Sequence, residues 1–179
     1  PPDPSVPRGD PTVDRVGSQG DVAAGCAAER RGVGGFGVSN FAKRVIKGAG
    51  GREWLNKTMA SFIPKPGRIA LTPMITEKGR LYGDLTVACL ADDHFMLFGS
   101  GVMQDAHSRF FAKTLPDGVT HENQTAQWHG IALSGPKSRE LLSRITRDDV
   151  SAEGMKFRDC CPLYTSDAAD EEDRGDLGG

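Results

Sequence analysis

The sequence lacks several features that would each indicate a particular class of protein. No apolar run approaches the roughly 18 residues of a membrane-spanning helix, and no secretory signal peptide is visible. The formal net charge is only −2, so no excess of one sign indicates a nucleic acid or an anionic membrane as partner. The four cysteines form no C-x-x-C pair and are typical of reduced, intracellular thiols. These absences favour an intracellular globular protein that binds neither membrane nor nucleic acid.

Familiar catalytic and metal-binding motifs are also missing. The histidines form no H-x-x-x-H or H-E-x-x-H pair, and their positions favour surface or capping roles over metal binding: His94, His107, His121 and His129. No G-x-S-x-G nucleophile elbow is present, and Ser134, followed by Gly135 and Pro136, suits the start of a helix. The sequence therefore predicts no metal site and no hydrolase triad of that type.

The two ends of the chain differ in composition from the middle. Five prolines stand in the first eleven residues, and residues 1–20 are predicted to be disordered. The tail from Tyr164 to Gly179 carries six acids and one base, so without it the net charge would be +3 instead of −2. Its letters LYTSDAADE resemble a translated sequencing-library adapter, with a natural acidic tail as the alternative. Residues 159–179 are thus expected to be a disordered artefact, and the natural protein to continue past about Arg158.

Residues 21–158 have the periodic patterns of a folded domain. Trp54, Leu55, Thr58, Met59 and Phe62 lie on one face of a helix predicted over 51–62. Three strand-like runs at 67–75, 80–90 and 95–99 are separated by the turns TEKG and ADDH, which predicts an antiparallel meander. Further helices are predicted at 21–31, at 102–115 and after Gly135-Pro136. In the last of these, Leu141, Leu142 and Ile145 are predicted to face inward. Further strands are predicted at 38–46 and within 119–135. This mixture predicts an α+β fold, a two-layer sandwich of an antiparallel sheet and packed helices.

The stretch GVGGFG, Gly32 to Gly37, matches the dinucleotide-binding fingerprint G-x-G-x-x-G. That fingerprint functions between a strand and a helix, with an acid about 20 residues further on that holds the ribose. Here a helical stretch precedes the glycines, a short strand-like stretch follows, and the nearest later acid is Glu53, inside another predicted helix. The context favours a flexible turn between helix and strand, and a dinucleotide-binding module is the less favoured alternative.

Asp84 stands in the middle of a predicted strand, where acids are unfavourable by propensity. Strand alternation places it on one face with Tyr82 and Thr86, and places Gly83 on the other face with Leu81, Leu85, Val87 and Cys89. The missing side chain at Gly83 could let a flat ligand come close. The alternative is a solvent-facing acid on the open side of an antiparallel sheet.

Four ordered blocks, from about Asp21 to Arg158, resemble the folate-binding domain of the aminomethyltransferase type. They are GVGGFGVSNFAK, PKPGRIALTPMITEKGRLYGDLTVA, FMLFGSG and IALSGPKSRELLSRIT. This domain occurs as the glycine-cleavage T-protein and in the C-terminal half of dimethylglycine and sarcosine dehydrogenases. The SNFAK, GRIALTPM and FGSG segments resemble the dehydrogenase branch more closely.

The resemblance implies one-carbon transfer to tetrahydrofolate. In the dehydrogenase branch, a separate FAD domain oxidises an N-methyl amine, and the folate domain captures the carbon as 5,10-methylenetetrahydrofolate; in the T-protein the carbon arrives on a lipoyl carrier. By motif match, Asp84 is the catalytic aspartate beside the folate nitrogens, and Thr86 lines the pterin pocket. Ser100 falls where the T-protein branch often has a ligand-contacting asparagine. Leu71 and Phe41 match pocket-wall positions, with plain core packing as the favoured alternative for each.

The chain also departs from the family pattern. The family usually has an aliphatic residue at position 35 and an acid at 37, and both are glycine here. The downstream Y-T-G-E-x-G block, whose tyrosine and glutamate help to hold the pterin, is absent, as is any FAD domain. The chain is therefore expected to be a fragment that holds part of one pocket and binds folate weakly or not at all. The resemblance implies a bacterial cytoplasm or a mitochondrial matrix, and leaves a non-catalytic folate-binding relative in regulation or tRNA modification as a further alternative.

Overall fold

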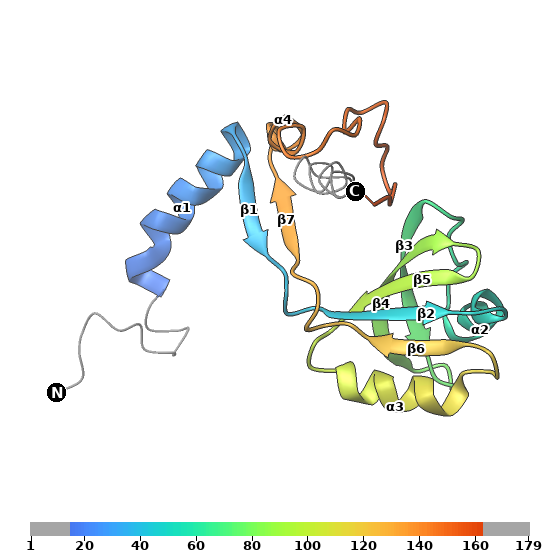
Figure 1. Ribbon diagram of the computed structural model, residues 1–179. Coiled ribbons are helices and arrows are strands. Elements are labelled where there is room, and N and C mark those ends of the chain that lie inside the picture. Colours follow the sequence, from blue (N-terminus) through green and yellow to red (C-terminus); the bar gives the residue numbers. More distant parts are fainter. Residues whose placement is uncertain (1–14, 163–179) are drawn as a thin grey trace, which may run out of the picture.

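The computed structural model describes residues 15–162, which form four helices and seven strands (Figure 1). In chain order these are α1 (Arg15–Arg31), β1 (Gly34–Gly37), β2 (Ala42–Lys47), α2 (Gly51–Thr58), β3 (Arg68–Ile75), β4 (Leu81–Ala91), β5 (His94–Gly99), α3 (Gln104–Thr114), β6 (Thr120–Asn123), β7 (Ile131–Ser134) and α4 (Ser138–Leu142).

Five of the strands form one antiparallel sheet in the order β3-β4-β5-β2-β6. The meander predicted from the TEKG and ADDH turns is its β3-β4-β5 half. Strand β2 precedes the meander in the chain but lies on the far side of β5, with Val45 opposite Met96. Strand β6 then pairs with the outer side of β2. The predicted α+β fold with an antiparallel sheet is confirmed.

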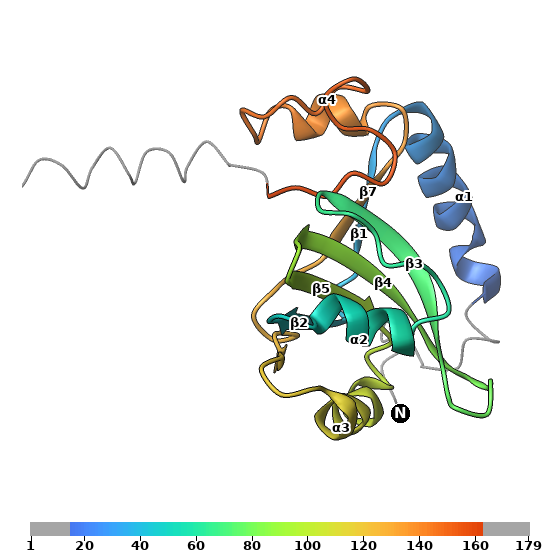
Figure 2. The same ribbon diagram turned by 90° about the vertical axis from the view of Figure 1, so that its right-hand side faces the viewer.

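Helices α2 and α3 cover one face of this sheet, which makes the two-layer core; Figure 2 shows α2 lying across the strands. The two helices meet where the ring of Trp54 packs edge-on against Phe111, with centroids 5.3 Å apart. Of the face predicted for the helix at 51–62, Trp54, Leu55, Thr58 and Met59 are buried, but α2 ends at Thr58 and Phe62 is 94% exposed. The core cluster consists of Ile46, Trp54, Leu55, Met59, Ile63, Met74, Leu85, Val87, Cys89, Phe95, Leu97, Phe111 and Val119.

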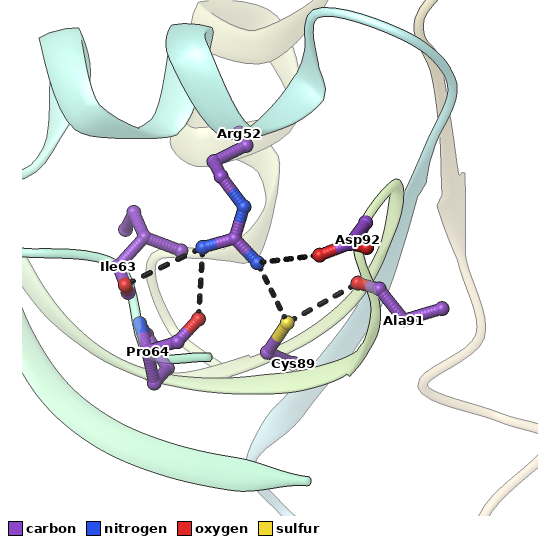
Figure 3. Close-up of polar contacts among 6 residues, drawn as sticks. All are labelled: Arg52, Ile63, Pro64, Cys89, Ala91 and Asp92. Atoms are coloured by element: carbon purple, nitrogen blue, oxygen red, sulfur yellow. Dashed lines mark hydrogen bonds and ion pairs between the residues drawn. The ribbon is translucent and has the colours of Figure 1, made fainter. Parts of the chain in front are cut away.

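Arg52 fastens α2 to the sheet at the end where β4 turns into β5 (Figure 3). Its guanidinium donates hydrogen bonds to the carbonyl of Pro64 at 2.9 Å and to the thiol of Cys89 at 3.1 Å, and it lies over the ring of Phe95. The Cys89 thiol in turn donates to the carbonyl of Ala91 at 3.2 Å. These contacts join α2, the segment after it and β4. Arg52 therefore has a structural role at the end of β4 remote from Asp84.

The GVGGFG stretch is not the flexible turn that its context favours. Four of its residues form β1, which pairs antiparallel with β7 in a separate two-stranded sheet. Figure 1 shows this ribbon, with α1 and α4, standing apart from the five-stranded sheet. The glycines follow the end of α1 and are themselves part of a strand, so they lack the strand–turn–helix setting of a dinucleotide site.

The predicted boundaries need three corrections. Helix α1 begins at Arg15, so residues 15–20 are helical and not disordered; residues 1–14 lie outside the described part. The fold extends past Arg158, because Asp159 bridges to Arg68 and the amide of Cys160 donates to the carbonyl of Gly67 at 2.8 Å. The remainder of the predicted tail, 163–179, is also outside the described part.

The last correction concerns α4, which is only five residues long and begins two residues after Pro136. Leu141 and Ile145, predicted to face inward, are 37% and 50% exposed.

No helix among residues 15–162 is both long and apolar enough to cross a membrane.

Candidate functional site

A cavity of about 580 Å³ opens on the face of the sheet that α2 and α3 leave uncovered. Its floor comes from β3, β4 and β5, and its walls come from the segment before β2 and the segment between β5 and α3. All five residues that the family resemblance assigns to the pocket line this one cavity. The full lining is Asn40, Phe41, Leu71, Asp84, Thr86, Phe98, Gly99, Ser100, Gly101, Val102 and Gln104.

The floor of the cavity is a row of side chains across three neighbouring strands. Thr86 on β4 lies directly opposite Leu71 on β3 and directly opposite Phe98 on β5. Because residues directly opposite each other share a face of the sheet, this register brings the hydroxyl between two apolar side chains. Asp84, two residues from Thr86 on the same strand, extends this face and is exposed.

For Leu71 and Phe41, packing in the core was the favoured alternative to a place in the pocket wall. The structure shows that this alternative is wrong. Leu71 is 66% exposed and Phe41 is 47% exposed, so neither belongs to the core. Leu71 faces the cavity from the edge strand β3, and Phe41 from the segment that leads into β2. Large apolar side chains exposed beside a carboxylate are typical of a site for an amphipathic ligand.

Gly83 does not serve to bring a ligand close to Asp84. It faces α3, where a Cβ atom would lie 2.7 Å from Nε2 of His107, so its missing side chain makes room for that histidine. Tyr82 is also on the α3 side: its hydroxyl donates to the carbonyl of Ala106 at 3.3 Å. A register shift between Met74 and Ile75 on β3 leaves Tyr82 as an extra residue in β4. This bulge breaks the alternation that had placed Tyr82 beside Asp84.

The walls of the cavity are two segments that touch each other. A Cβ atom on Gly101 would lie only 2.1 Å from the carbonyl oxygen of Asn40, so only glycine allows this approach. Ser100 stands between Gly99 and Gly101 at the rim and is exposed. The close packing of the two walls therefore requires glycine at the second glycine position of the FGSG motif, Gly101.

The charge of the site comes from Asp84. No cationic side chain within residues 20–162 forms an ion pair with this carboxylate. Its oxygens are therefore available to accept hydrogen bonds from a ligand or to stabilise positive charge. No group of three histidine, cysteine or acidic side chains that could hold a metal ion occurs in the described part of the chain.

Two histidines lie beneath the site, on the α3 side of the sheet. His107 is buried, which corrects the surface or capping role predicted for it, and burial lowers its pKa. Burial and the charge of Arg44 together lower the pKa of His121 to about 4. Both imidazoles are therefore neutral at physiological pH and belong to the packing between β2, β6 and α3.

Sequence patterns missed several residues around the cavity. Phe98 could have been found, because strand alternation in FMLFG separates it from the buried Phe95 and Leu97. Asn40 and Gln104 come to the cavity only because the two wall segments meet, and no spacing in the sequence indicates this. The sequence does not indicate the burial of Lys43 and Arg44 behind the walls either, because adjacent charges in a strand are typical of a solvated edge.

Comparisons with known proteins agree with the resemblance seen in the four sequence blocks. Residues 12–169 match the family described as the GCVT N-terminal domain. Mouse mitochondrial dimethylglycine dehydrogenase is 32% identical over 130 residues, which are 70% of this chain and 15% of that protein. An aminomethyltransferase of Natranaerobius thermophilus is 26% identical over 141 residues, 71% of this chain and 39% of that protein. The chain therefore spans well under half the length of these relatives.

The fold has a counterpart among solved structures. The crystal structure of the glycine cleavage system aminomethyltransferase T from Bartonella henselae superposes with a TM-score of 0.63 at 20% sequence identity. The superposition covers 69% of this chain and 34% of that chain. It supports the same arrangement of strands and helices in both.

Proposed function

Because the chain belongs to the GCVT N-terminal domain family, we propose that it is part of a tetrahydrofolate-dependent one-carbon transfer enzyme. In this proposal the enzyme captures the methyl-derived carbon of an N-methyl amine, of the dimethylglycine or sarcosine type, as 5,10-methylenetetrahydrofolate. The observation that carries the proposal is the convergence of Asp84, Thr86, Ser100, Leu71 and Phe41 on a single cavity. These positions are spread over sixty residues of sequence and come from two strands, β3 and β4, and two connecting segments.

The cavity fits a reduced pterin in size and chemistry. Its volume of about 580 Å³ lies within the 300–1,000 Å³ that small-molecule sites usually have. A pterin is flat and carries several N–H donors along its edge. Phe41, Leu71 and Phe98 offer apolar surface for its faces, while Asp84 offers carboxylate acceptors for its edge.

Each residue has a distinct role in this proposal. Tetrahydrofolate, when bound, supplies the amine nitrogens that accept a carbon at the oxidation level of formaldehyde. Asp84 accepts a hydrogen bond or a proton from the reacting amine and stabilises nearby positive charge. The hydroxyls of Thr86 and Ser100 hydrogen-bond the pterin edge, and Leu71 and Phe41 exclude water from its faces.

The glycine-cleavage aminomethyltransferase reaction is the second candidate. It is favoured by the superposition on aminomethyltransferase T and by the similarity to bacterial aminomethyltransferases. Both candidates use the same folate cavity and differ in what delivers the carbon: an FAD-binding domain outside this chain, or a lipoyl carrier. The coding sequence around the chain separates them, since an FAD-binding half upstream in the same reading frame supports the first candidate and its absence the second. The compartment we propose is a bacterial cytoplasm or a mitochondrial matrix.

Titration by NMR tests the binding role of the cavity and of Asp84. The ¹⁵N-labelled chain is titrated with 5-formyltetrahydrofolate, a stable reduced folate, up to millimolar concentration, since only weak binding is expected from part of a pocket. Amide shifts should change at Asp84, Thr86 and Ser100. A hydrogen bond to a charged group contributes about 1.5–3 kcal/mol, so Asp84→Asn should weaken binding about 10-fold or more.

Asp117→Asn is the matched control, because Asp117 is an exposed acid outside the cavity. It should bind the folate as the unmodified chain does. Equal affinity in the Asp84→Asn and Asp117→Asn variants would contradict the role of Asp84. Shift changes that fall outside the cavity, or none at millimolar folate, would contradict the proposed folate site altogether.

A further inference from the structure

Two consecutive cations of β2, Lys43 and Arg44, are buried on opposite faces of the sheet. Lys43 is 2% exposed and Arg44 is 1% exposed. Within the described residues neither forms an ion pair with a carboxylate. Burying an unpaired charge is costly unless hydrogen bonds compensate for the lost water. The partners that compensate these two charges are mainly backbone carbonyls, and those carbonyls belong to the cavity walls.

Lys43 holds the wall that precedes β2. Its ammonium donates hydrogen bonds to the carbonyl of Ser39 at 2.7 Å and to the carbonyl of Phe41 at 2.9 Å. Asn40 and Phe41, which line the cavity, lie within the loop that these two bonds close. Because both bonds come from one charged group, the loop is fixed at two points by a single side chain.

Arg44 holds the opposite wall from the other face of the sheet. Its guanidinium donates hydrogen bonds to the carbonyl of Gln104 and, at 2.7 Å, to the hydroxyl of Ser108, both in α3. It also lies over the ring of Phe111 and within 3.0 Å of Nε2 of His121. Gln104 is the first residue of α3 and lines the cavity, so Arg44 fixes the point at which that wall enters the helix.

The two walls are in direct contact, since the carbonyl of Asn40 packs against Gly101 without room for a Cβ atom. Neither cation is among the residues that line the cavity. We propose that Lys43 and Arg44 are a pair of positioning residues that hold the two walls of the cavity at their mutual distance. The identity of the ligand rests on the proposed function. The role of Lys43 and Arg44 in holding the walls is independent of that function.

Hydrogen exchange of single amides tests this proposal. The expected crossed pattern is that each variant speeds exchange in the wall that its cation holds and not in the other wall. Lys43→Met should speed exchange of the Phe41 amide, which donates to Val38 within the first wall, by about 10-fold or more. Arg44→Met should do the same at Met103 and Gln104, whose amides donate to Ser100 and Gly101. Each variant should leave the amides of the other wall less affected. Lys47→Met, an exposed lysine on the same strand, is the control and should change neither wall.

Either of two results would overturn the proposal. The first is exchange that accelerates equally in both walls and in the centre of β4, since that pattern is general destabilisation. The second is unchanged exchange in both walls. If the methionine variants do not fold, Lys43→Arg and Arg44→Lys, which keep the charge and change the hydrogen-bond geometry, are judged by the same crossed pattern.

Titration of the same variants with 5-formyltetrahydrofolate connects the walls with binding. Affinity should fall about 5-fold or more in Lys43→Met and Arg44→Met, because a displaced wall loses its contacts with the ligand, and should be kept in Lys47→Met. Unchanged affinity in a variant whose wall has loosened would overturn the role of these residues in ligand binding. If the unmodified chain shows no shift changes with this folate, the proposed function fails, while the exchange pattern still decides whether the two cations hold the walls.

Discussion

Replacing Gly101 by alanine should damage the candidate site at its tightest point. A Cβ atom at this position would lie 2.1 Å from the carbonyl oxygen of Asn40, whereas real Cβ contacts are essentially never shorter than 3.0 Å. The two walls must therefore separate by about 0.9 Å or distort. The oxygen belongs to the backbone and is further restrained because Lys43 holds the carbonyls on either side of it, so no side-chain rotation relieves the clash.

The size of the effect follows from the behaviour of overpacked sites. Overpacking of this kind costs about 1–3 kcal/mol of folding free energy. For a chain of this length each kcal/mol lowers the melting temperature by about 2–4 °C, so Gly101→Ala should melt about 2–12 °C lower than the unmodified chain. Thermal unfolding followed by circular dichroism measures this. Titration with 5-formyltetrahydrofolate should show weaker binding as well, since the mouth of the cavity changes shape.

Gly37→Ala is the matched control, because a Cβ atom at Gly37 would have no neighbour within 4 Å. Its melting temperature should stay close to that of the unmodified chain, as for most surface substitutions. A melting temperature of Gly101→Ala no lower than that of Gly37→Ala would contradict the tight contact between the walls. If Gly101→Ala melted lower but kept its folate affinity, the tight contact would stand, but the walls would not shape the site.

Two further predictions concern the packing behind the site. The pKa of His121 is about 4 in the folded chain and about 6.5 when unfolded, so the unfolded state takes up the proton first and stability falls between pH 6.5 and 4, with a slope of at most about 1.4 kcal/mol per pH unit. Urea midpoints at pH 7, 5.5 and 4.5 should decrease in that order, and His121→Gln should flatten the trend; a trend unchanged in this variant would contradict the assignment. Phe111→Ala should cost about 3–5 kcal/mol, because this ring is fully buried against Trp54 and Arg44. Phe62→Ala, at a side chain 94% exposed, should cost almost nothing by the same denaturation assay, and equal losses would contradict the core assignment.

Local patterns predicted most of the elements of the five-stranded domain. The buried face of α2 follows from Trp54, Leu55 and Thr58 at helical spacing, and the turns TEKG and ADDH mark the meander. Turns and amphipathic faces depend on neighbours a few residues away, so the sequence contains them directly. The resemblance to the GCVT domain likewise rests on contiguous blocks, and the comparisons confirm it.

Long-range packing decided what local patterns could not. The GVGGFG glycines form a strand only because β7, about a hundred residues later, supplies hydrogen-bond partners. The bulge at Tyr82 depends on the register with β3, and it overrides strict alternation. His107 is buried because Gly83 on a different element leaves it space.

Local patterns were enough to predict the α+β class and the meander, and the four family-like blocks indicated the family and assigned five residues to the pocket. Three features come from the packing of the whole chain: these five residues share one cavity, Leu71 and Phe41 face it instead of the core, and Lys43 and Arg44 lie buried behind its walls. This is because burial of the whole apolar face of the sheet determines which strands pair and in which register. A side chain's surroundings therefore depend on segments that lie far away in the chain.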